Sequence, residues 1–366
     1  MPNTVTWSIE PIDTLFFRQG TPYDLGQQVL TGDVLFPPHM STLQGAIRTA
    51  IARAQGWQPG RDDKWPEILG TPDNLGEMSL EGVFLQKDGQ WLFPVPRHLM
   101  RISHQKKTIY QNNLVYLKPG PLVESDLGVS ALPIVDARIS DEDKVSDIGD
   151  AYISEEGLAL CLQGQVPPDT TIVPVECLWK LEIRTGLTIS DQSQTAEPGL
   201  LYQSTHVRLE KGVAIGISVH GIPWEWQECI RAFPLGGERR FARVSLSKNA
   251  IPIPPLNVQP SRDGYVRVFA LLLTPGLFEN PGHVLRHGPF PDPCLSAVTG
   301  RITMRGGWDL KRHMPRPLRP FIPAGSLWFY RLTPEMWDTL KLLHDHHIGL
   351  EGEYGFGHII FGQWEE

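Results

Sequence analysis

Apolar positions along the chain follow both strand and helix periods, so a mixed fold is expected. Residues 4–12 alternate between apolar and polar side chains, which is typical of a strand. The clearest helix begins near Ser41, because apolar residues over 43–54 are spaced three and four apart. Arg48 lies off this apolar stripe, so we expect it to point away from the core.

A similar order of elements recurs toward the end of the chain. Residues 326–332 predict a strand, Thr333 and Pro334 predict the start of a helix that runs to about 347, and residues 358–364 predict a last strand. Antiparallel hairpins are predicted between these groups. Strand–helix–strand units in both halves indicate an α+β fold of two ferredoxin-like, or RRM-like, domains.

The length of 366 residues also favours two domains, because a single hydrophobic core rarely grows to this size. We place an N-terminal domain at 1–172 and a C-terminal domain, with a glycine-rich terminal loop, at 173–366. Residues from about 96 to 153 lack strong periodicity and are interpreted as a long insertion in the first domain.

Composition indicates a cytoplasmic protein with no membrane contact. No run approaches the roughly 18 apolar residues of a membrane span, and the opening residues do not resemble a secretion signal. The cysteines are too widely spaced for a zinc site or a disulfide scaffold. We expect reduced core residues at Cys161, Cys177, Cys229 and Cys294.

Charge is distributed unevenly. The formal net charge of −8 argues mildly against nucleic-acid binding. However, residues 301–320 hold six basic side chains against one acid, and residues 97–107 hold four against none. Local potential decides where a polyanion binds, so RNA is not excluded. Solvated loops are the alternative interpretation of these basic runs.

Three glycine-rich segments have the composition of RNA-binding loops. Arg18 and Gly20 precede the first predicted helix, and residues 235–244 place two glycines before Arg239 and Arg240. Glycines permit close backbone approach, and guanidinium groups suit phosphates. In the loop 352–357 the aromatic residues would suit stacking on bases. For each segment the alternative is an ordinary turn, and in the last loop the aromatics would fill the core.

No catalytic or cofactor motif is present, and we predict no cofactor. His344 and His347 share a predicted helical face but have no further ligand at suitable spacing, so we predict no metal site. His206 would suit a general base in RNA cleavage. A lone histidine in a strand is more often structural or a phosphate contact.

Taken together, these segments resemble the repeat-associated mysterious protein (RAMP) superfamily of CRISPR systems. The similarity is greatest to the family of third subunits of the Cmr, or type III-B, effector complex. It rests on the runs LFFRQG and LFPPHMSTLQGAIRTAI, then EIRTGLTI, STHVRLEKG, LGGERRFARV and GEYGFGHIIFGQW, which occur in family order.

The resemblance implies a non-catalytic subunit that anchors the 5′ handle of the crRNA in defence against foreign nucleic acid. It implies as partners the large polymerase-like Cmr subunit and a backbone RAMP subunit. RNA-binding candidates carried over from the matching motifs are Arg18, Gly20, Gly45, Arg48, Arg184, His206, Arg208, Gly236, Gly237, Arg239, Arg240, Gly352, Tyr354, Gly355, Phe356 and Gly357.

Two other functions remain open from the residues. The first is a metal-independent endoribonuclease that processes CRISPR repeat RNA, with His206 as its base. The second is a protein-interaction subunit with little RNA contact, which the net charge of −8 favours. The sequence does not determine the handle sequence, the role of residues 96–153 or nucleotide binding at a subunit interface.

Overall fold

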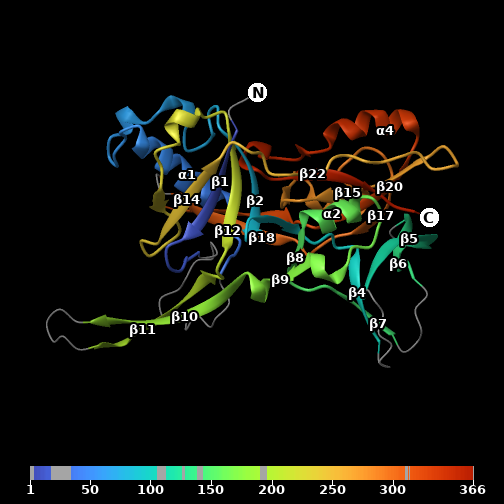
Figure 1. The fold of residues 1–366 in the computed structure, drawn as a ribbon, viewed down its shortest axis with the longest axis horizontal. Coiled ribbons are helices and arrows are strands. Elements are labelled where there is room, and N and C mark those ends of the chain that lie inside the picture. The colour runs from blue at the N-terminus through green and yellow to red at the C-terminus, as the bar shows by residue number, and fades with distance from the viewer. Residues whose placement is uncertain are drawn as a thin grey trace. The chain divides into compact units, whose positions relative to one another are not determined.

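The computed structural model describes residues 4–17, 34–104, 113–125, 128–137, 143–189, 196–309, 312 and 314–365. It is a strand-rich α+β protein with short helices (Figure 1). The chain forms two compact units, and each is assembled from three segments. The predicted domains, by contrast, are two consecutive ranges, 1–172 and 173–366. The first unit comprises Met1–Asp88, Glu176–Ala250 and Met304–Arg319, and the second comprises Gly89–Val175, Ile251–Thr303 and Pro320–Glu366.

The first unit is built on a sheet in which β1 is central. Its strand order is β13-β14-β1-β12-β2, and every neighbouring pair is antiparallel. The predicted first strand is confirmed as β1, whose Val5, Trp7 and Ile9 are buried. The Trp7 indole Nε1 donates to Gln227 Oε1 at 2.7 Å, which satisfies its polar atom inside the core.

The predicted first helix is confirmed as α1, which packs against β2 and β13. Its N-cap is His39, whose ring accepts from the Ser41 backbone N–H. Arg48 corrects the sequence prediction: it is buried, and it donates to Gln44 Oε1 at 3.1 Å and to the Thr71 carbonyl at 2.7 Å. The loop that contains Thr71 therefore covers Arg48, a helix position that the apolar stripe alone predicts to be exposed.

Two further strand pairs belong largely to the first unit. β10 and β11 form a long antiparallel hairpin that extends away from the sheet (Figure 1). β18 pairs with β19, and we call their residues 304–319 the arginine ribbon. The elements of this unit are β1 (Val5–Pro11), α1 (Met40–Ala54), β2 (Ser79–Lys87), β10 (Trp179–Ile189), β11 (Ala196–Leu209), β12 (Val213–His220), β13 (Ala232–Pro234), β14 (Phe241–Ser247), β18 (Thr303–Asp309) and β19 (Met314–Ile322), the last two of which extend into residues of the second unit.

The second unit has its core on the sheet β17-β20-β15-β22-β21. Every residue of β15 is buried. Helices α3 and α4 add Val284, Trp337 and Leu340 to this core. The Trp328 indole donates to the Val284 carbonyl at 2.9 Å, so α3 is tied to the sheet by a buried hydrogen bond.

Residues 96–153, predicted as an insertion, belong to the second unit and carry the sheet β6-β5-β4-β7. His98 fixes this region to the core, because its buried ring stacks on Tyr116 at 4.6 Å and lies 4.8 Å from the Phe269 ring. A further three-stranded segment has the order β3-β8-β9. The elements of the second unit are β3 (Gln90–Pro94), β4 (Leu99–His104), β5 (Leu114–Ser125), β6 (Gly128–Val135), β7 (Asp143–Asp147), β8 (Ala151–Ser154), α2 (Glu155–Leu162), β9 (Ile172–Pro174), β15 (Val266–Leu272), β16 (Gly276–Leu277), α3 (Pro281–His287), β17 (Cys294–Val298), β20 (Leu327–Leu332), α4 (Pro334–Leu340), β21 (His346–His347) and β22 (His358–Gln363).

Two sequence predictions need correction. The helix after Thr333 ends at Leu340, and His346 and His347 lie on a short strand that pairs with β22, so no helical face joins His344 to His347. The cysteines are free thiols as expected, but they are not all core residues. Cys161 is buried and Cys294 is half-buried, whereas Cys177 and Cys229 are exposed.

Among the residues that the structure describes, no helix is both long and apolar enough to span a membrane.

Candidate functional site

Residues 12–17, which we call the exit segment, leave β1 and bring three distant parts of the first unit together. Leu15 and Val207 of β11 exchange two backbone hydrogen bonds of 2.8 Å. The Gly237 N–H donates to the Phe16 carbonyl, also at 2.8 Å. The exit segment is therefore fixed between the β10–β11 hairpin and the turn that precedes β14.

The two predicted glycines of that turn are required by the chain's own packing. Gly236 has a φ of +81°, and a Cβ at this position would lie 2.5 Å from the Phe16 carbonyl oxygen. A Cβ on Gly237 would lie 2.8 Å from the Phe16 ring. The close backbone approach predicted here is thus made by the exit segment, and both glycines act in folding.

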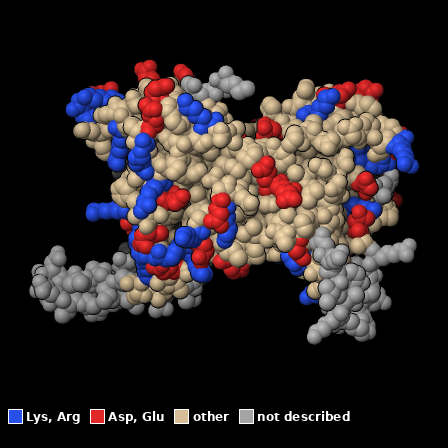
Figure 2. All heavy atoms as spheres, in the orientation of Figure 1, with Lys and Arg blue, Asp and Glu red and all other residues tan. Residues whose placement is uncertain are grey.

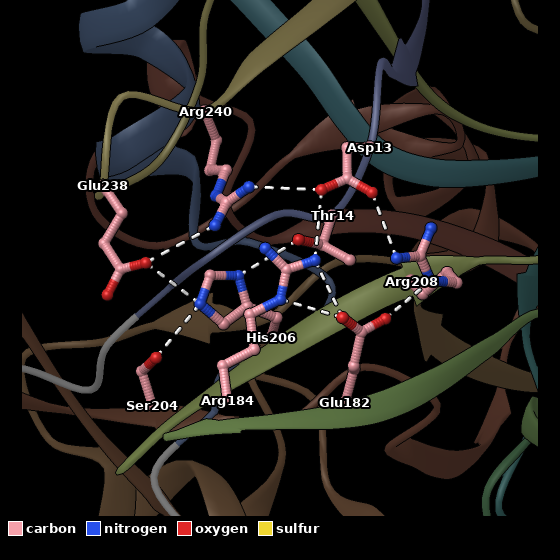
Figure 3. A network of polar contacts seen from close by, with 9 residues as sticks. All are labelled: Asp13, Thr14, Glu182, Arg184, Ser204, His206, Arg208, Glu238 and Arg240. Carbon is pink, nitrogen blue, oxygen red and sulfur yellow. Dashed lines mark hydrogen bonds and ion pairs between the residues drawn. The ribbon is translucent and has the colours of Figure 1, made fainter. Parts of the chain in front are cut away.

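Asp13 of the exit segment is the common acceptor of three arginines (Figure 3). Arg184 and Arg240 donate to its Oδ2 at 3.1 and 3.2 Å, and Arg208 donates to its Oδ1 at 3.0 Å. The hydrogen bond from Arg184, together with the Arg208 interactions, holds the pKa of the Asp13 carboxyl below its usual value of 3.8.

A second carboxylate, Glu182 on β10, bridges two of the same arginines. Arg208 Nε donates to Glu182 Oε2 at 2.7 Å, and Arg184 Nε donates to Oε1 at 2.8 Å. These bonds, with that from Arg208 contributing most, lower the pKa of Glu182. Strand alternation brings the groups together, since residues two apart on β10 share one face and β11 is paired beside it.

His206 lies beneath these ion pairs and is fully buried (Figure 3). Its Nδ1 lies 3.1 Å from Thr14 Oγ1, and its Nε2 lies 3.1 Å from Ser204 Oγ and 3.0 Å from Glu238 Oε2. Phe16 stacks on the ring with a centroid separation of 5.1 Å. Because a carboxylate only accepts, we assign the imidazole proton to Nε2 and let Nδ1 accept from the Thr14 hydroxyl.

Burial lowers the pKa of His206 from 6.5, and the charges of Arg240 and Arg184 act in the same direction against the opposing effect of Glu238. Both ring nitrogens have protein partners and the ring has no exposed surface. In this conformation His206 holds the exit segment and does not face a substrate.

The site has as many formal positive as negative side chains in its ion pairs. Lys, Arg, Asp and Glu are also interspersed on the visible surface around the base of the hairpin, as Figure 2 shows. The arginines are partly exposed, from 20% for Arg240 to 46% for Arg208. We call this set the Asp13 network; it consists of Asp13, Thr14, Glu182, Arg184, Ser204, His206, Arg208, Glu238 and Arg240.

The structure thus joins Arg184, His206, Arg208 and Arg240, which the sequence predicted in three separate motifs. Arg239 follows Glu238 in the same turn, has a φ of 53° and is exposed. The predicted candidates Arg18 and Gly20 lie outside the described residues.

The candidates on α1 differ from one another. A Cβ on Gly45 would meet no atom within 4 Å, so the structure gives no packing reason for a glycine there. Arg48 is held by Gln44 and Thr71, and its guanidinium lies 5.6 Å from the Trp65 ring centroid. Its buried position is that of a structural residue.

The terminal glycine-rich loop belongs to the second unit and packs inward. Tyr354 and Phe356 are buried, and Phe356 lies 4.9 Å from the Phe321 ring. The alternative interpretation, in which the aromatics fill the core, is the one that this burial supports. Gly355 and Gly357 have positive φ, and packing also requires a glycine at 357, because a Cβ there would lie 2.0 Å from the Ile348 carbonyl oxygen.

Sequence reasoning missed the acids and hydroxyls that organise the site. Asp13 is a single acid in a loop, and its bond to Arg208 spans 195 positions. One signal was available: Glu182 and Arg184, like His206 and Arg208, are two apart in predicted strands and therefore share a face. The other missed residues are Thr14, Ser204 and Glu238.

Comparison with known proteins places the chain in a family. A family model described as CRISPR-associated protein (Cas_Cmr3) matches residues 7–364. The comparison with curated proteins found no match.

Solved structures of type III CRISPR complexes contain similar chains. One belongs to Type III-B Cmr-beta bound to cognate target RNA and AMPPnP (state 1); it is 15% identical, with a TM-score of 0.51, and the alignment covers 95% of this chain and 91% of that chain. Another, from Type III-B Cmr-beta bound to cognate target RNA, is 14% identical with a TM-score of 0.49, and 93% and 89% are covered. The first of these shows a shared fold. Since the family model spans nearly the whole sequence, the chain belongs to the Cas_Cmr3 family of CRISPR-associated proteins and is a Cmr-type type III CRISPR subunit.

Proposed function

We propose that this chain is a non-catalytic RNA-binding subunit of a type III-B (Cmr) ribonucleoprotein that anchors the 5′ handle of the crRNA. In this proposal it also joins the large polymerase-like subunit to the backbone RAMP subunit. Family membership supports a place in a type III effector complex. The Type III-B Cmr-beta assembly that contains a chain of similar fold is bound to cognate target RNA.

The observation that carries the RNA-binding part is the convergence of arginines from three segments. The Asp13 network fixes Arg184 and Arg208 of the hairpin and Arg240 of the turn in one partly exposed group. Held guanidinium groups lose little further rotamer freedom when they contact phosphate, which favours binding. The network thus presents three arginine side chains in fixed positions, although their charges are already paired with carboxylates.

A direct test compares RNA carrying the handle with RNA in which the handle is scrambled. We expect the full-length chain to bind the first more tightly, with affinity falling as salt rises from about 50 to about 200 mM. Arg208→Gln should weaken handle binding by about tenfold if this arginine contacts phosphate. Arg331→Gln is the matched control, because Arg331 is 42% exposed and also ion-paired, with Asp263. Equal binding to both RNAs, or equal effects of both substitutions, would contradict handle anchoring.

The endoribonuclease alternative has less support from the site. Its candidate base, His206, is buried and bonded at both ring nitrogens. We therefore propose that the chain is not an enzyme. Prolonged incubation with repeat RNA should leave the RNA intact. Cleavage that is present in the wild type and absent in a folded His206→Gln variant would establish the alternative.

The interaction-subunit alternative predicts no contact with the guide. Photo-cross-linking within an assembled complex tests this, since a cross-link from Arg208 or Arg239 to the handle supports our proposal. Cross-links confined to neighbouring proteins would favour the alternative.

The proposal includes two ferredoxin-like domains as the fold-level basis of RNA binding. The sheets of both units and the helices that pack on them are compatible with this description. An experimental structure of the assembled complex would test it, because each domain should then show the β-α-β-β-α-β order.

A further inference from the structure

The strand β14 has one face in the core of the first unit and one face that is exposed. Ala242 and Val244 point into the core and are buried. Successive side chains of a strand point to opposite faces, so Phe241, Arg243 and Ser245 lie together on the other side. All three are exposed. The outer face of β14 is therefore accessible from outside the chain.

Phe241 is an unusual residue for this face, because the solvated face of an antiparallel sheet is ordinarily polar. Its side chain is 46% exposed. The strands on both sides present apolar residues beside it. The Phe241 carbonyl accepts from the Ile12 N–H at 3.0 Å, and Ile12 is 52% exposed. On β13 the directly paired residue is the half-buried Pro234. Backbone pairing on both sides thus fixes an exposed aromatic ring within a small apolar patch.

The chain around this ring is basic. Residues 231–248 hold five basic side chains against one acid, Glu238. That acid lies 3.0 Å from His206 Nε2 and 3.6 Å from Arg240, so it belongs to the Asp13 network. Arg239, two positions before Phe241, is exposed, and so is Arg243, whose partner across the ladder is Glu10. A ligand that matches this surface has a flat apolar group next to negative charge.

We propose that Phe241 stacks on a base of single-stranded RNA, with Arg239 and Arg243 near the adjoining phosphates. Exposed aromatic rings among basic side chains hold single strands in this way, because every base has a flat face. The inference rests on the proposed function for the source of the RNA, and it adds a base contact to a site described so far through charge. Stacking tolerates all four bases, so Phe241 contributes affinity and does not read the handle sequence.

The test uses the full-length chain, handle RNA and three variants of one residue. Phe241→Ala should weaken binding about tenfold, as expected for one lost stack. Phe241→Tyr keeps the flat ring and should stay within about twofold of the wild type. Phe241→Leu keeps an apolar side chain without a ring and should resemble Phe241→Ala. The salt dependence of affinity should be the same in all variants, because none of them removes a charge.

Tyr265→Ala is the matched control, because Tyr265 is 39% exposed and its ring is already covered by the Arg331 guanidinium at 4.0 Å. It should change affinity less than about twofold. All variants should melt within about 3 °C of the wild type, since the replaced rings are partly exposed. Wild-type affinity in Phe241→Leu, or equal losses in Phe241→Ala and Tyr265→Ala, would overturn the proposal.

Abasic RNA of the same length provides a second measurement, because it keeps the phosphates and lacks the bases. Wild type and Phe241→Ala should bind it equally. A difference as large as that seen with handle RNA would mean that the ring does not contact a base. An acidic protein segment is the competing occupant of this surface. Unchanged RNA binding by Phe241→Ala together with impaired assembly with other Cmr subunits would assign the surface to a protein and refute stacking.

The same measurements separate this inference from the proposed function. If the wild type binds handle and scrambled RNA equally while Phe241→Ala weakens both, handle anchoring fails and the stacking contact stands. If the wild type prefers handle RNA and Phe241→Ala binds it equally well, stacking is refuted and handle anchoring stands.

Discussion

The Asp13 network and the arginine ribbon both gather arginines in the first unit, but they differ in how the charge is compensated. In the network, Arg184, Arg208 and Arg240 share the carboxylates of Asp13, Glu182 and Glu238. In the ribbon, Arg305 has no carboxylate partner among the described residues, although Arg312 nearby has two.

Arginines that are paired within the protein and arginines that are unpaired therefore have different roles, which amino-acid composition alone does not distinguish. Arginines paired within the protein hold segments together, and RNA can use them only by adding to or replacing bonds that exist already. An unpaired arginine contributes little to folding and leaves its full charge for a ligand. Substitutions in the network should therefore reduce stability, whereas substitutions at Arg305 should leave stability nearly unchanged.

The largest stability effect should come from the turn that carries the network. Gly236→Ala should lower the free energy of unfolding by roughly 2–4 kcal/mol, because the new Cβ meets the Phe16 carbonyl in a strained backbone conformation. Gly60→Ala is the control: Gly60 has a similar φ of +83° but no atom within 4 Å of an added Cβ, so the loss should be about 1 kcal/mol. Urea unfolding measures both. Equal losses would show that the exit segment is not packed as described.

Replacement of the buried histidine should have the next largest effect. His206→Gln leaves polar groups of Thr14, Ser204 and Glu238 imperfectly paired, and we expect a loss of about 2–3 kcal/mol. His220→Gln, at a histidine that is 27% exposed and 3.4 Å from Glu81, should cost less than about 1 kcal/mol. If the two variants unfold at the same urea concentration, His206 does not hold the network.

The pH dependence of stability follows from the same histidine. Its pKa is lower in the folded chain than the ordinary 6.5, so the unfolded chain takes up a proton first as pH falls. The contribution of neutral His206 is complete above about pH 6.5 and is lost progressively below it. Urea unfolding across this range should show a smaller decrease in stability for His206→Gln than for the wild type.

Asp13→Asn should have a smaller effect because its ion pairs are partly exposed. We expect the melting temperature to fall by about 2–4 °C, since three arginines lose a shared charged acceptor. Asp73→Asn, which affects only the exposed pair with Arg312, should leave it nearly unchanged. Thermal unfolding that ranks these variants in the opposite order would place the more important ion pair in the ribbon.

Salt should produce the smallest difference. Added sodium chloride screens the attractive pairs of the network. The melting temperature of Asp13→Asn should therefore depend less on salt than that of Arg305→Gln, which keeps the network intact. Identical salt dependence in the two variants would remove the distinction between paired and unpaired arginines.

The elements with strong local patterns were predictable from the sequence. The strand at residues 4–12 and the start of the first helix near Ser41 were found because alternation and helical spacing are local signals. Arg48 was misplaced, since its burial depends on a loop about 23 residues further along the chain. The helix after Thr333 was predicted too long because its end at Leu340 is set by pairing of His346 and His347 with β22.

The candidate site was predictable only in part. Arg184, His206, Arg208 and Arg240 were chosen from three motifs. Strand spacing puts His206 and Arg208 on one face, but no local pattern joins the three motifs to one another. Asp13 joins them through contacts that span up to 227 positions, and a single loop aspartate carries no local signal. The basic run at 301–320 was visible in the sequence, yet its paired and unpaired arginines can be separated only after Asp309 and Asp73 are placed.

The division of each unit into three segments has a consequence for synthesis of the chain. Ribosomes make the protein from its N-terminus, so β1 and α1 exist long before residues 304–319 leave the exit tunnel. The first unit can be completed only when most of the polypeptide has been made. Arg305 and Arg319 arrive last, and a truncated product that ends before them presents an incomplete first unit.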